Sequence, residues 1–221
     1  MAIRYYKNGL ITISSGNRKL IENENTKFMV FNLPAVKTCP FATPHCIKNC
    51  YALKAEIYPT ARTARENNYK ASLTKTFVLD MSTLINETLK KQSYKNAKQI
   101  IFRIHESGDF YNQEYFNDWI AIAAYSPNIK FIAYTKSIKY ALETEYTIPK
   151  NFIITASIWD DSPEYFVKAA FENFKIYTAY NEFTVDHLVK NENYQKCRCE
   201  DCATCQKCFV NNKSKIACII H

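Results

Sequence analysis

Residues 99–125 read QIIFRIHESGDFYNQEYFNDWIAIAAY, and this stretch decides the fold class. Its first part, Gln99–His105, is a short run rich in β-branched and aromatic residues, which predicts a strand. The part that follows, Asn112–Tyr125, places apolar residues such as Phe116 and Trp119 at helical spacing and predicts a helix. A strand that leads directly into a helix is typical of a βαβ unit.

The same alternation continues along the chain. Further strands are predicted at Ile129–Thr135, Asn151–Ser157 and Phe174–Ala179, and further helices at Ser162–Asn173 and Thr184–Lys190. Ser162 is the predicted N-cap of its helix, with Pro163 at the first helical position. We therefore predict an α/β fold with a parallel sheet, and the number of units favours a partial (βα) barrel over a closed one.

The segments before this alternation are less regular. Residues 1–33 read as an irregular or β-hairpin segment, and residues 32–50 form a loop that contains three prolines and three cysteines. From residue 52 to residue 92 the pattern is helical, with a break expected near Asp80–Ser82.

The composition narrows the class of protein. The chain has 221 residues, nine cysteines and only three glycines, which are Gly9, Gly16 and Gly108. No apolar run approaches the roughly 20 residues that span a bilayer, and the N-terminus has no signal-peptide core. We therefore expect a cytoplasmic protein without a membrane partner. In that compartment clustered cysteines more often bind metal than form disulfides.

The formal net charge of +8 permits an anionic partner such as nucleic acid. The lysines are scattered, however, and there is no block of like charges and no arginine-rich arm. A solvated basic surface is the simpler interpretation, so the charge does not decide between a small-molecule and a nucleic-acid substrate.

The first cysteine group, Cys39, Cys46 and Cys50, has C-x6-C-x3-C spacing. Three cysteines on one loop can hold a single metal centre and leave a coordination position open, as a reactive centre requires. We favour a [4Fe–4S] cluster over zinc. The alternatives are a structural zinc site completed by His45 or a distant cysteine, and three unrelated thiols.

The second cysteine group lies in a C-terminal extension predicted at residues 192–221, after a main domain at residues 1–191. Its six members are Cys197, Cys199, Cys202, Cys205, Cys208 and Cys218. The C-x2-C repeats are typical both of ferredoxin-like [4Fe–4S] ligation and of zinc bound by four thiolates. The sequence therefore predicts an auxiliary metal site but leaves a second [4Fe–4S] cluster and zinc as alternatives.

Polar residues at the strand ends make up a candidate pocket, because parallel sheets bind ligands at the carboxyl ends of their strands. Gly108 follows the first strand in a chain that otherwise avoids glycine, which indicates a positive φ or a close approach to a ligand. Asp109 beside it is a candidate ligand contact, or a cap for the next helix. We take His105 and Lys136, at two strand ends, as candidate catalytic residues, although a histidine on an apolar strand is as often part of the core.

With these parts in this order, the chain resembles the radical S-adenosylmethionine proteins. That superfamily carries a three-cysteine [4Fe–4S] loop after its first strand, here matched by the first cysteine group, although the usual spacing is C-x3-C-x2-C. The resemblance implies an enzyme that cleaves S-adenosylmethionine to a 5′-deoxyadenosyl radical, with electrons from an external donor, acting on an unknown substrate. It assigns six cofactor-binding residues, namely Tyr51, Ser107, Gly108, Asp109, Ser157 and Asp160.

The segments CIKNCYA, RIHESGDFYNQEYFNDW and FIAYTKS also resemble the phage and plasmid proteins called the gene product eighty-eight family. This resemblance covers most of residues 30–210 and implies no particular reaction. The alternative to an enzyme is a non-catalytic protein stabilised by zinc or iron–sulfur sites that binds a partner such as nucleic acid.

Overall fold

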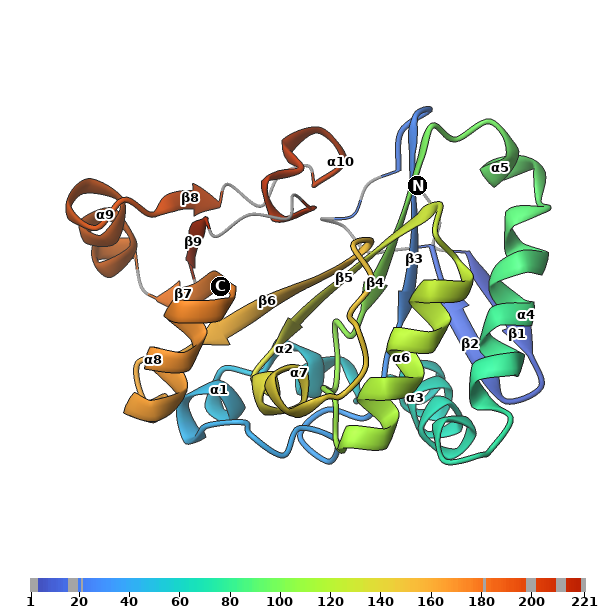
Figure 1. The fold of residues 1–221 in the computed structure, drawn as a ribbon, viewed down its shortest axis with the longest axis horizontal. Coiled ribbons are helices and arrows are strands. Elements are labelled where there is room, and N and C mark those ends of the chain that lie inside the picture. Colours follow the sequence, from blue (N-terminus) through green and yellow to red (C-terminus); the bar gives the residue numbers. More distant parts are fainter. Residues whose placement is uncertain are drawn as a thin grey trace.

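The computed structural model describes residues 4–15, 20, 22–180, 182–197, 202–209 and 214–219. Gly16 and Cys199 lie outside the described residues. The described chain forms a mixed α/β structure around one nine-stranded sheet, in the order β1-β2-β3-β4-β5-β6-β7-β9-β8 (Figure 1). The pairs β1–β2 and β2–β3 are antiparallel, and all pairs from β3 onward are parallel.

The strands are β1 Tyr5–Asn8, β2 Ile11–Ser14, β3 Thr26–Phe31, β4 Gln99–Ile104, β5 Ile129–Thr135, β6 Phe152–Ile158, β7 Lys175–Tyr180, β8 Gln195–Cys197 and β9 Lys215–Ile219. The helices are α1 Pro44–Lys48, α2 Tyr51–Ala55, α3 Pro59–Ser72, α4 Phe77–Leu89, α5 Gln92–Lys95, α6 Gln113–Tyr125, α7 Ile138–Glu143, α8 Glu164–Asn173, α9 Glu182–Asn191 and α10 Cys202–Cys205, followed by a 3₁₀ turn, η1, at Lys207–Phe209.

The predicted βα alternation is confirmed from β4 to α9. The N-cap of α6 is Asn112, whose side chain accepts a hydrogen bond from Tyr115 N at 2.8 Å, as its position before the helix predicts. Two details are wrong. The helical segment breaks at residues 56–58, 73–76 and 90–91 instead of near Asp80–Ser82. Ser162 does not cap α8, because its hydroxyl accepts from Trp159 N.

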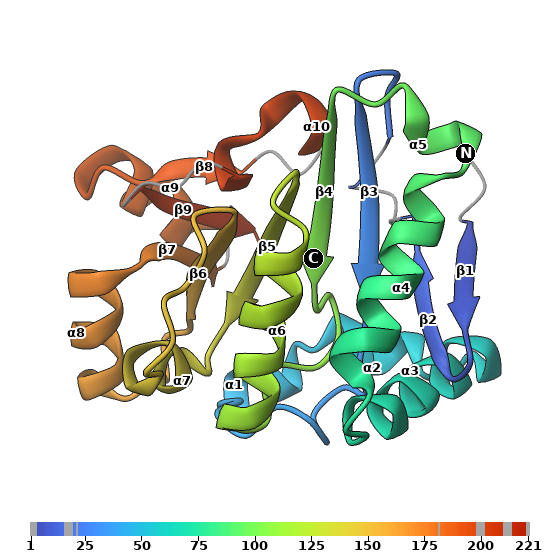
Figure 2. The same cartoon turned by 45° about the vertical axis from the view of Figure 1, so that its right-hand side comes forward.

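The two faces of the sheet are covered differently. Large aromatic side chains fill the helical face, where β3, β4 and β5 pack against α4 and α6 (Figures 1 and 2). Trp119 at the centre of this core contacts Phe31, Phe77 and Phe102, with ring centroids 5.5–5.9 Å apart. Because side chains alternate along a strand, the residues between these aromatics point to the opposite face, here called the inner face.

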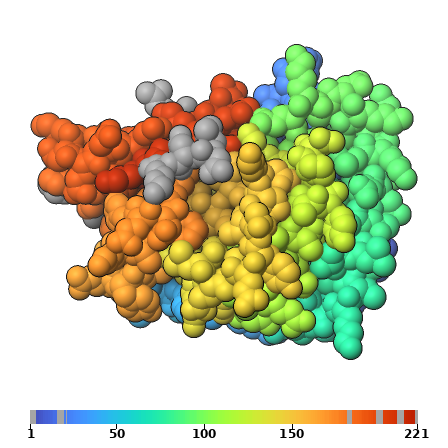
Figure 3. Space-filling model, viewed as in Figure 1, coloured from blue at the N-terminus to red at the C-terminus, as the bar shows by residue number. Residues whose placement is uncertain are grey.

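The C-terminal segment covers part of the inner face. Ala203 and Phe209 pack there against Phe28, Ile101 and other apolar side chains of β3–β6. β9 then joins the sheet between β7 and β8, with three consecutive buried residues. In the space-filling view the orange and red C-terminal residues lie along the upper left of the molecule, and the green residues of α4 and α5 lie on its right (Figure 3).

Sequence reasoning predicted neither β9 nor β3 as a strand of the parallel sheet. The sequences of both strands, TKFMVF and KIACI, lack a clear polar–apolar alternation, so periodicity is a weak signal for them. Within the described residues, no helix has the length and apolar character to cross a membrane.

Candidate metal centre

The loop that carries Cys39, Cys46 and Cys50 leaves β3 and runs across the carboxyl edge of the parallel strands (Figure 1). All three thiols are partly buried and none forms a disulfide. Local capping sets their positions, because Thr43 Oγ1 accepts from Cys46 N at 3.2 Å and Cys50 Sγ accepts from Leu53 N at 3.4 Å. The structure thus brings the three predicted ligands to one edge of the sheet.

The start of this loop is fixed to the end of β4. Ser107 Oγ donates to Leu33 O at 2.7 Å, and Leu33 N donates back to Ser107 O at 2.9 Å. The Asn32 side chain accepts from both Glu106 N and Ser107 N, at 2.7 and 3.0 Å. Ser107 is 2% exposed, so its hydroxyl holds the loop instead of facing a ligand, contrary to the predicted cofactor contact.

Gly108 has φ of +85°, which confirms the positive φ expected from the sequence. A Cβ at this position would lie 2.6 Å from both Leu33 Cβ and Thr38 Oγ1. Glycine is therefore required here by the close approach of the cysteine loop, which takes the place of the ligand expected from the sequence.

Asp109 is buried and joins the end of β4 to the end of β5. Its carboxylate accepts from Phe110 N at 2.8 Å, from Lys136 N at 2.9 Å and from the Thr135 hydroxyl. Burial raises the pKa of Asp109, while the Lys136 charge and these hydrogen bonds oppose the rise. This side chain holds the site together, which differs from the direct ligand contact that the sequence predicted.

Lys136 is the cation of the site. Its ammonium group lies 3.5 Å from Ser157 Oγ and close enough to Cys46 to lower the pKa of that thiol. Burial raises the pKa of Cys39 to about 12, Asp109 adds to that rise, and Lys136 opposes it. Burial also raises the pKa of Cys46, again opposed by Lys136. The lysine thus lowers the free energy of thiolates that burial disfavours.

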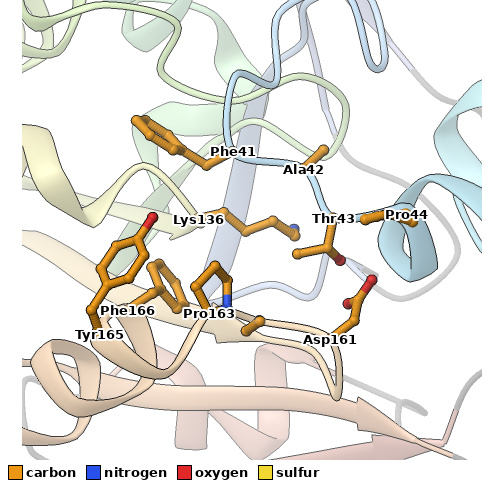
Figure 4. A pocket seen from close by; sticks show the side chains of 10 residues that line it. Phe41, Ala42, Thr43, Pro44, Lys136, Asp161, Pro163, Tyr165 and Phe166 are labelled. Atoms are coloured by element: carbon orange, nitrogen blue, oxygen red, sulfur yellow. The ribbon is translucent and has the colours of Figure 1, made fainter.

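A pocket of about 270 Å³ opens beside Lys136, between the cysteine loop and the start of α8 (Figure 4). Figure 4 shows the Lys136 side chain extended along the pocket with its nitrogen toward Thr43. The lining is mainly apolar or aromatic and consists of Phe41, Ala42, Thr43, Pro44, Lys136, Asp161, Ser162, Pro163, Tyr165 and Phe166. A concave, mostly apolar pocket with a few polar groups is typical of small-molecule sites.

The far side of the cysteine loop is joined to the turn after β6. His45 Nδ1 pairs with Asp160, and His45 N donates to Asp161 Oδ2 at 2.8 Å. Among the described residues these three form the one group with metal-ligating atoms within 4.8 Å of one another. Asp160 is exposed and pairs with His45, which fixes the loop; the cofactor contact predicted for this residue stays a prediction.

His105 does not face the cysteine loop, and the structure does not support its predicted catalytic role. Its φ of +62° turns the ring to the helical face, where it is 3% exposed and Nε2 lies 2.7 Å from the Tyr115 hydroxyl. Burial, with a further contribution from Arg103, lowers the pKa of His105 to about 3. The neutral imidazole is therefore part of the aromatic core.

Tyr51 is 62% exposed and remains at the site, because its hydroxyl donates to Glu106 O at 2.7 Å across the mouth of the cysteine loop. Ser157 also remains, beside the Lys136 ammonium. Of the predicted small-molecule contacts, Tyr51 and Asp160 are exposed, Lys136 is half-buried and lines the pocket, and Ser157 is buried beside the Lys136 ammonium.

The second cysteine group is divided in space. Cys202, Cys205 and Cys208 lie on α10 and η1 against the inner face, while Cys197 and Cys218 are register partners in β8 and β9. Cys199 cannot be placed, since it lies outside the described residues. The five described cysteines of this group therefore lie on two different parts of the fold, α10–η1 and the β8–β9 pair.

Sequence reasoning missed several residues that shape the site. Asn32 and Asp161 are short polar side chains after strands, a common turn pattern that carries little information by itself. Thr38 lies within the cysteine loop, where its hydroxyl donates to Pro34 O at 2.7 Å. Arg103 stood inside a strand pattern, and only the sheet shows that it points to the inner face.

The fold and site define an α/β protein with a cysteine-bearing loop at the carboxyl edge of a parallel sheet. Residues 11–211 match the family model described as Gene product 88, so the chain belongs to this family. Over 104 residues it is 34% identical to the Gene 88 protein of Mycobacterium phage L5, covering 45% of this chain and 43% of that protein.

The Gene 88 protein of Mycobacterium phage D29 is 33% identical over 104 residues, covering 45% of this chain and 42% of that protein. The matched segment thus spans less than half the length of these curated relatives. No solved structure matches the chain.

Proposed function

We propose that this protein is an iron–sulfur enzyme of the radical S-adenosylmethionine type, built on a partial (βα) barrel with a C-terminal metal-binding extension. The observation that supports this most is the cysteine loop. It offers Cys39, Cys46 and Cys50 at the carboxyl edge of the sheet, next to the Lys136 ammonium and the pocket. That edge is where parallel sheets bind their ligands.

The donor set fits a [4Fe–4S] cluster. Three thiols come from one loop, none is in a disulfide, and thiolates are the usual ligands of such clusters. Three ligands leave one position open to a small molecule. The chemistry that such a cluster supplies when bound is one-electron reduction of S-adenosylmethionine.

The residues around the loop would prepare the ligands. With its pKa near 12, Cys39 is a neutral thiol at pH 7, so metal binding there releases a proton. Lys136 offsets the negative charge of the bound thiolates. Its position beside Ser157 and the apolar pocket also suits it to contact the polar part of a nucleoside-containing molecule whose base enters the pocket.

The C-terminal cysteines would hold the auxiliary site. Cys202, Cys205 and Cys208 lie on one short segment, and the Cys205 charge acts on the Cys208 thiol. Either a second [4Fe–4S] cluster or zinc suits these ligands.

Anaerobic purification followed by iron, sulfide and zinc analysis tests the proposal. The protein is then incubated with S-adenosylmethionine and dithionite, which replaces the external electron donor, and 5′-deoxyadenosine is measured. We expect iron, sulfide and 5′-deoxyadenosine in the wild-type protein. Cys46→Ser should abolish 5′-deoxyadenosine formation, whereas the matched variant Cys205→Ser should lose only auxiliary metal.

Two results would overturn the proposal. Stoichiometric zinc without sulfide would favour a metal-stabilised binding protein. Iron and sulfide without 5′-deoxyadenosine would leave an iron–sulfur protein with a different task.

A further inference from the structure

Arg103 on β4 points to the inner face, where its guanidinium carbon lies 3.9 Å from the centroid of the Tyr134 ring. This stacking fixes the plane of the guanidinium, because cation–π contact holds the flat group against the ring. An arginine held in this way loses little further side-chain entropy when it binds a planar ligand. Arg103 is therefore already oriented.

Most hydrogen-bond donors of Arg103 have no protein acceptor within the described chain. Nε donates to His105 O at 3.2 Å, and no carboxylate forms an ion pair with the guanidinium among those residues. Arg103 is half-buried, so part of its side chain reaches solvent, and the Glu106 charge acts on its guanidinium. A guanidinium has five N–H donors, and the terminal ones form the fork that binds carboxylate or phosphate oxygens.

This cation lies between the two cysteine segments. Its charge acts on the Tyr51 hydroxyl, next to Cys50 in the first group, and also on the Cys208 thiol in the second. The Tyr134 hydroxyl contacts the same Cys208 thiol. Arg103 therefore lies close enough to both cysteine segments, and Tyr134 to the second, to act on their side chains.

We propose that Arg103, held flat on Tyr134, binds a carboxylate or phosphate group of an acidic ligand on the inner face. The fork of the guanidinium supports two parallel N–H···O hydrogen bonds from its terminal nitrogens, which have no acceptor among the described residues. The anion site does not depend on the radical chemistry. Only the identification of that ligand as the enzyme's substrate rests on the function proposed above.

Arginine-selective modification of the intact wild-type protein tests the site without any variant. The protein is treated with phenylglyoxal in the presence of inorganic phosphate or of succinate, and the modified peptides are identified by mass spectrometry. We expect one of the two anions to slow modification of Arg103 severalfold. Arg62, an exposed residue of α3, is the internal control and should be unaffected. Equal protection of both arginines, or none at Arg103, would overturn the proposal.

Calorimetric titration with the same two anions gives the affinity. Arg103→Gln should weaken binding by about tenfold or more, as expected when charge-assisted hydrogen bonds are lost. Arg103→Lys keeps the charge but removes the fork and should give an intermediate loss, whereas Arg62→Gln should change nothing.

The two anions distinguish a phosphate ligand from a carboxylate ligand. Equal loss in Arg62→Gln and Arg103→Gln would mean general surface charge and would refute the site. Because the titration needs no S-adenosylmethionine, its outcome is separate from that of the 5′-deoxyadenosine assay.

Discussion

Gly108→Ala tests whether the glycine is required by contact between the β4 end and the cysteine loop. The new Cβ would lie 2.6 Å from Leu33 Cβ and Thr38 Oγ1, so one of the two segments must move. Overpacking of this kind costs about 1–3 kcal/mol. The φ of +85° adds a further cost of about 1–2 kcal/mol for a residue with a side chain. The expected loss of unfolding free energy is thus about 2–5 kcal/mol.

Gly9→Ala is the matched control. Gly9 also has a positive φ, +54°, but nothing lies within 4 Å of its would-be Cβ. Its substitution carries the backbone cost alone, about 1–2 kcal/mol. Both changes restrict the unfolded chain equally, so that effect cancels in the comparison.

Urea unfolding followed by circular dichroism measures both variants, read from the midpoint and slope of each transition. For a chain of this size, each kcal/mol lowers Tm by roughly 2–4 °C. We expect Gly108→Ala to fall below Gly9→Ala by about 1–3 kcal/mol and to bind less iron, because the loop that holds the cysteines is displaced. Equal stability of the two variants would refute the role assigned to the loop contact.

Three further predictions concern pH and buried polar groups. The pKa of His105 is about 3 in the folded protein and 6.5 in the unfolded chain, so below pH 6.5 the unfolded state binds a proton that the folded state does not, and the free energy of unfolding falls. Between pH 6.5 and pH 5 this loss amounts to up to about 2 kcal/mol. His105→Asn should remove it, as measured by urea midpoints at the two pH values. Burial and the Glu114 charge raise the pKa of Asp118 from 3.8 to about 6, so ionisation of this carboxyl destabilises the folded protein as the pH rises through this range. Asp118→Asn should therefore raise the free energy of unfolding by about 1 kcal/mol at pH 7 and leave it unchanged at pH 3.5. A gain at both pH values would show that ionisation of Asp118 is not the cause. The buried Asn68 side chain accepts from Thr12 N at 2.7 Å and donates to Thr12 O at 2.9 Å. Asn68→Ala leaves both backbone groups without this partner and should lower the free energy of unfolding by about 2–4 kcal/mol, measured by thermal or chemical unfolding. A loss below about 1 kcal/mol would show that water takes the place of the amide.

The sequence was most informative where local chemistry is strong. The β4–α6 unit followed from the change of apolar period at Asn112, and Gly108 marked a positive φ because glycine is rare in this chain. Cysteine spacing identified both candidate metal-binding segments. Such features depend on neighbouring residues alone, so a sequence is sufficient to find them.

What lies next to the cysteine loop was decided by the tertiary structure. Ser107, Asp109 and Asp160 have the chemistry of ligand contacts, yet each holds one segment to another, because a buried polar group takes whatever partner the fold brings near. Arg103 became informative only when the sheet set which face it occupies, and only the structure placed the predicted residue Lys136 beside the Cys46 thiol.

The sequence by itself thus determined the α/β alternation, the cysteine-bearing loop and its conformational requirement at Gly108. Only the tertiary structure decided that β9 completes the sheet, that His105 is a core residue and that Arg103 lies between two cysteine segments. The physical reason is the separation along the chain over which each kind of interaction acts. Periodicity, capping and φ act over a few residues, whereas strand pairing, burial and charge contacts join residues that are far apart in the chain.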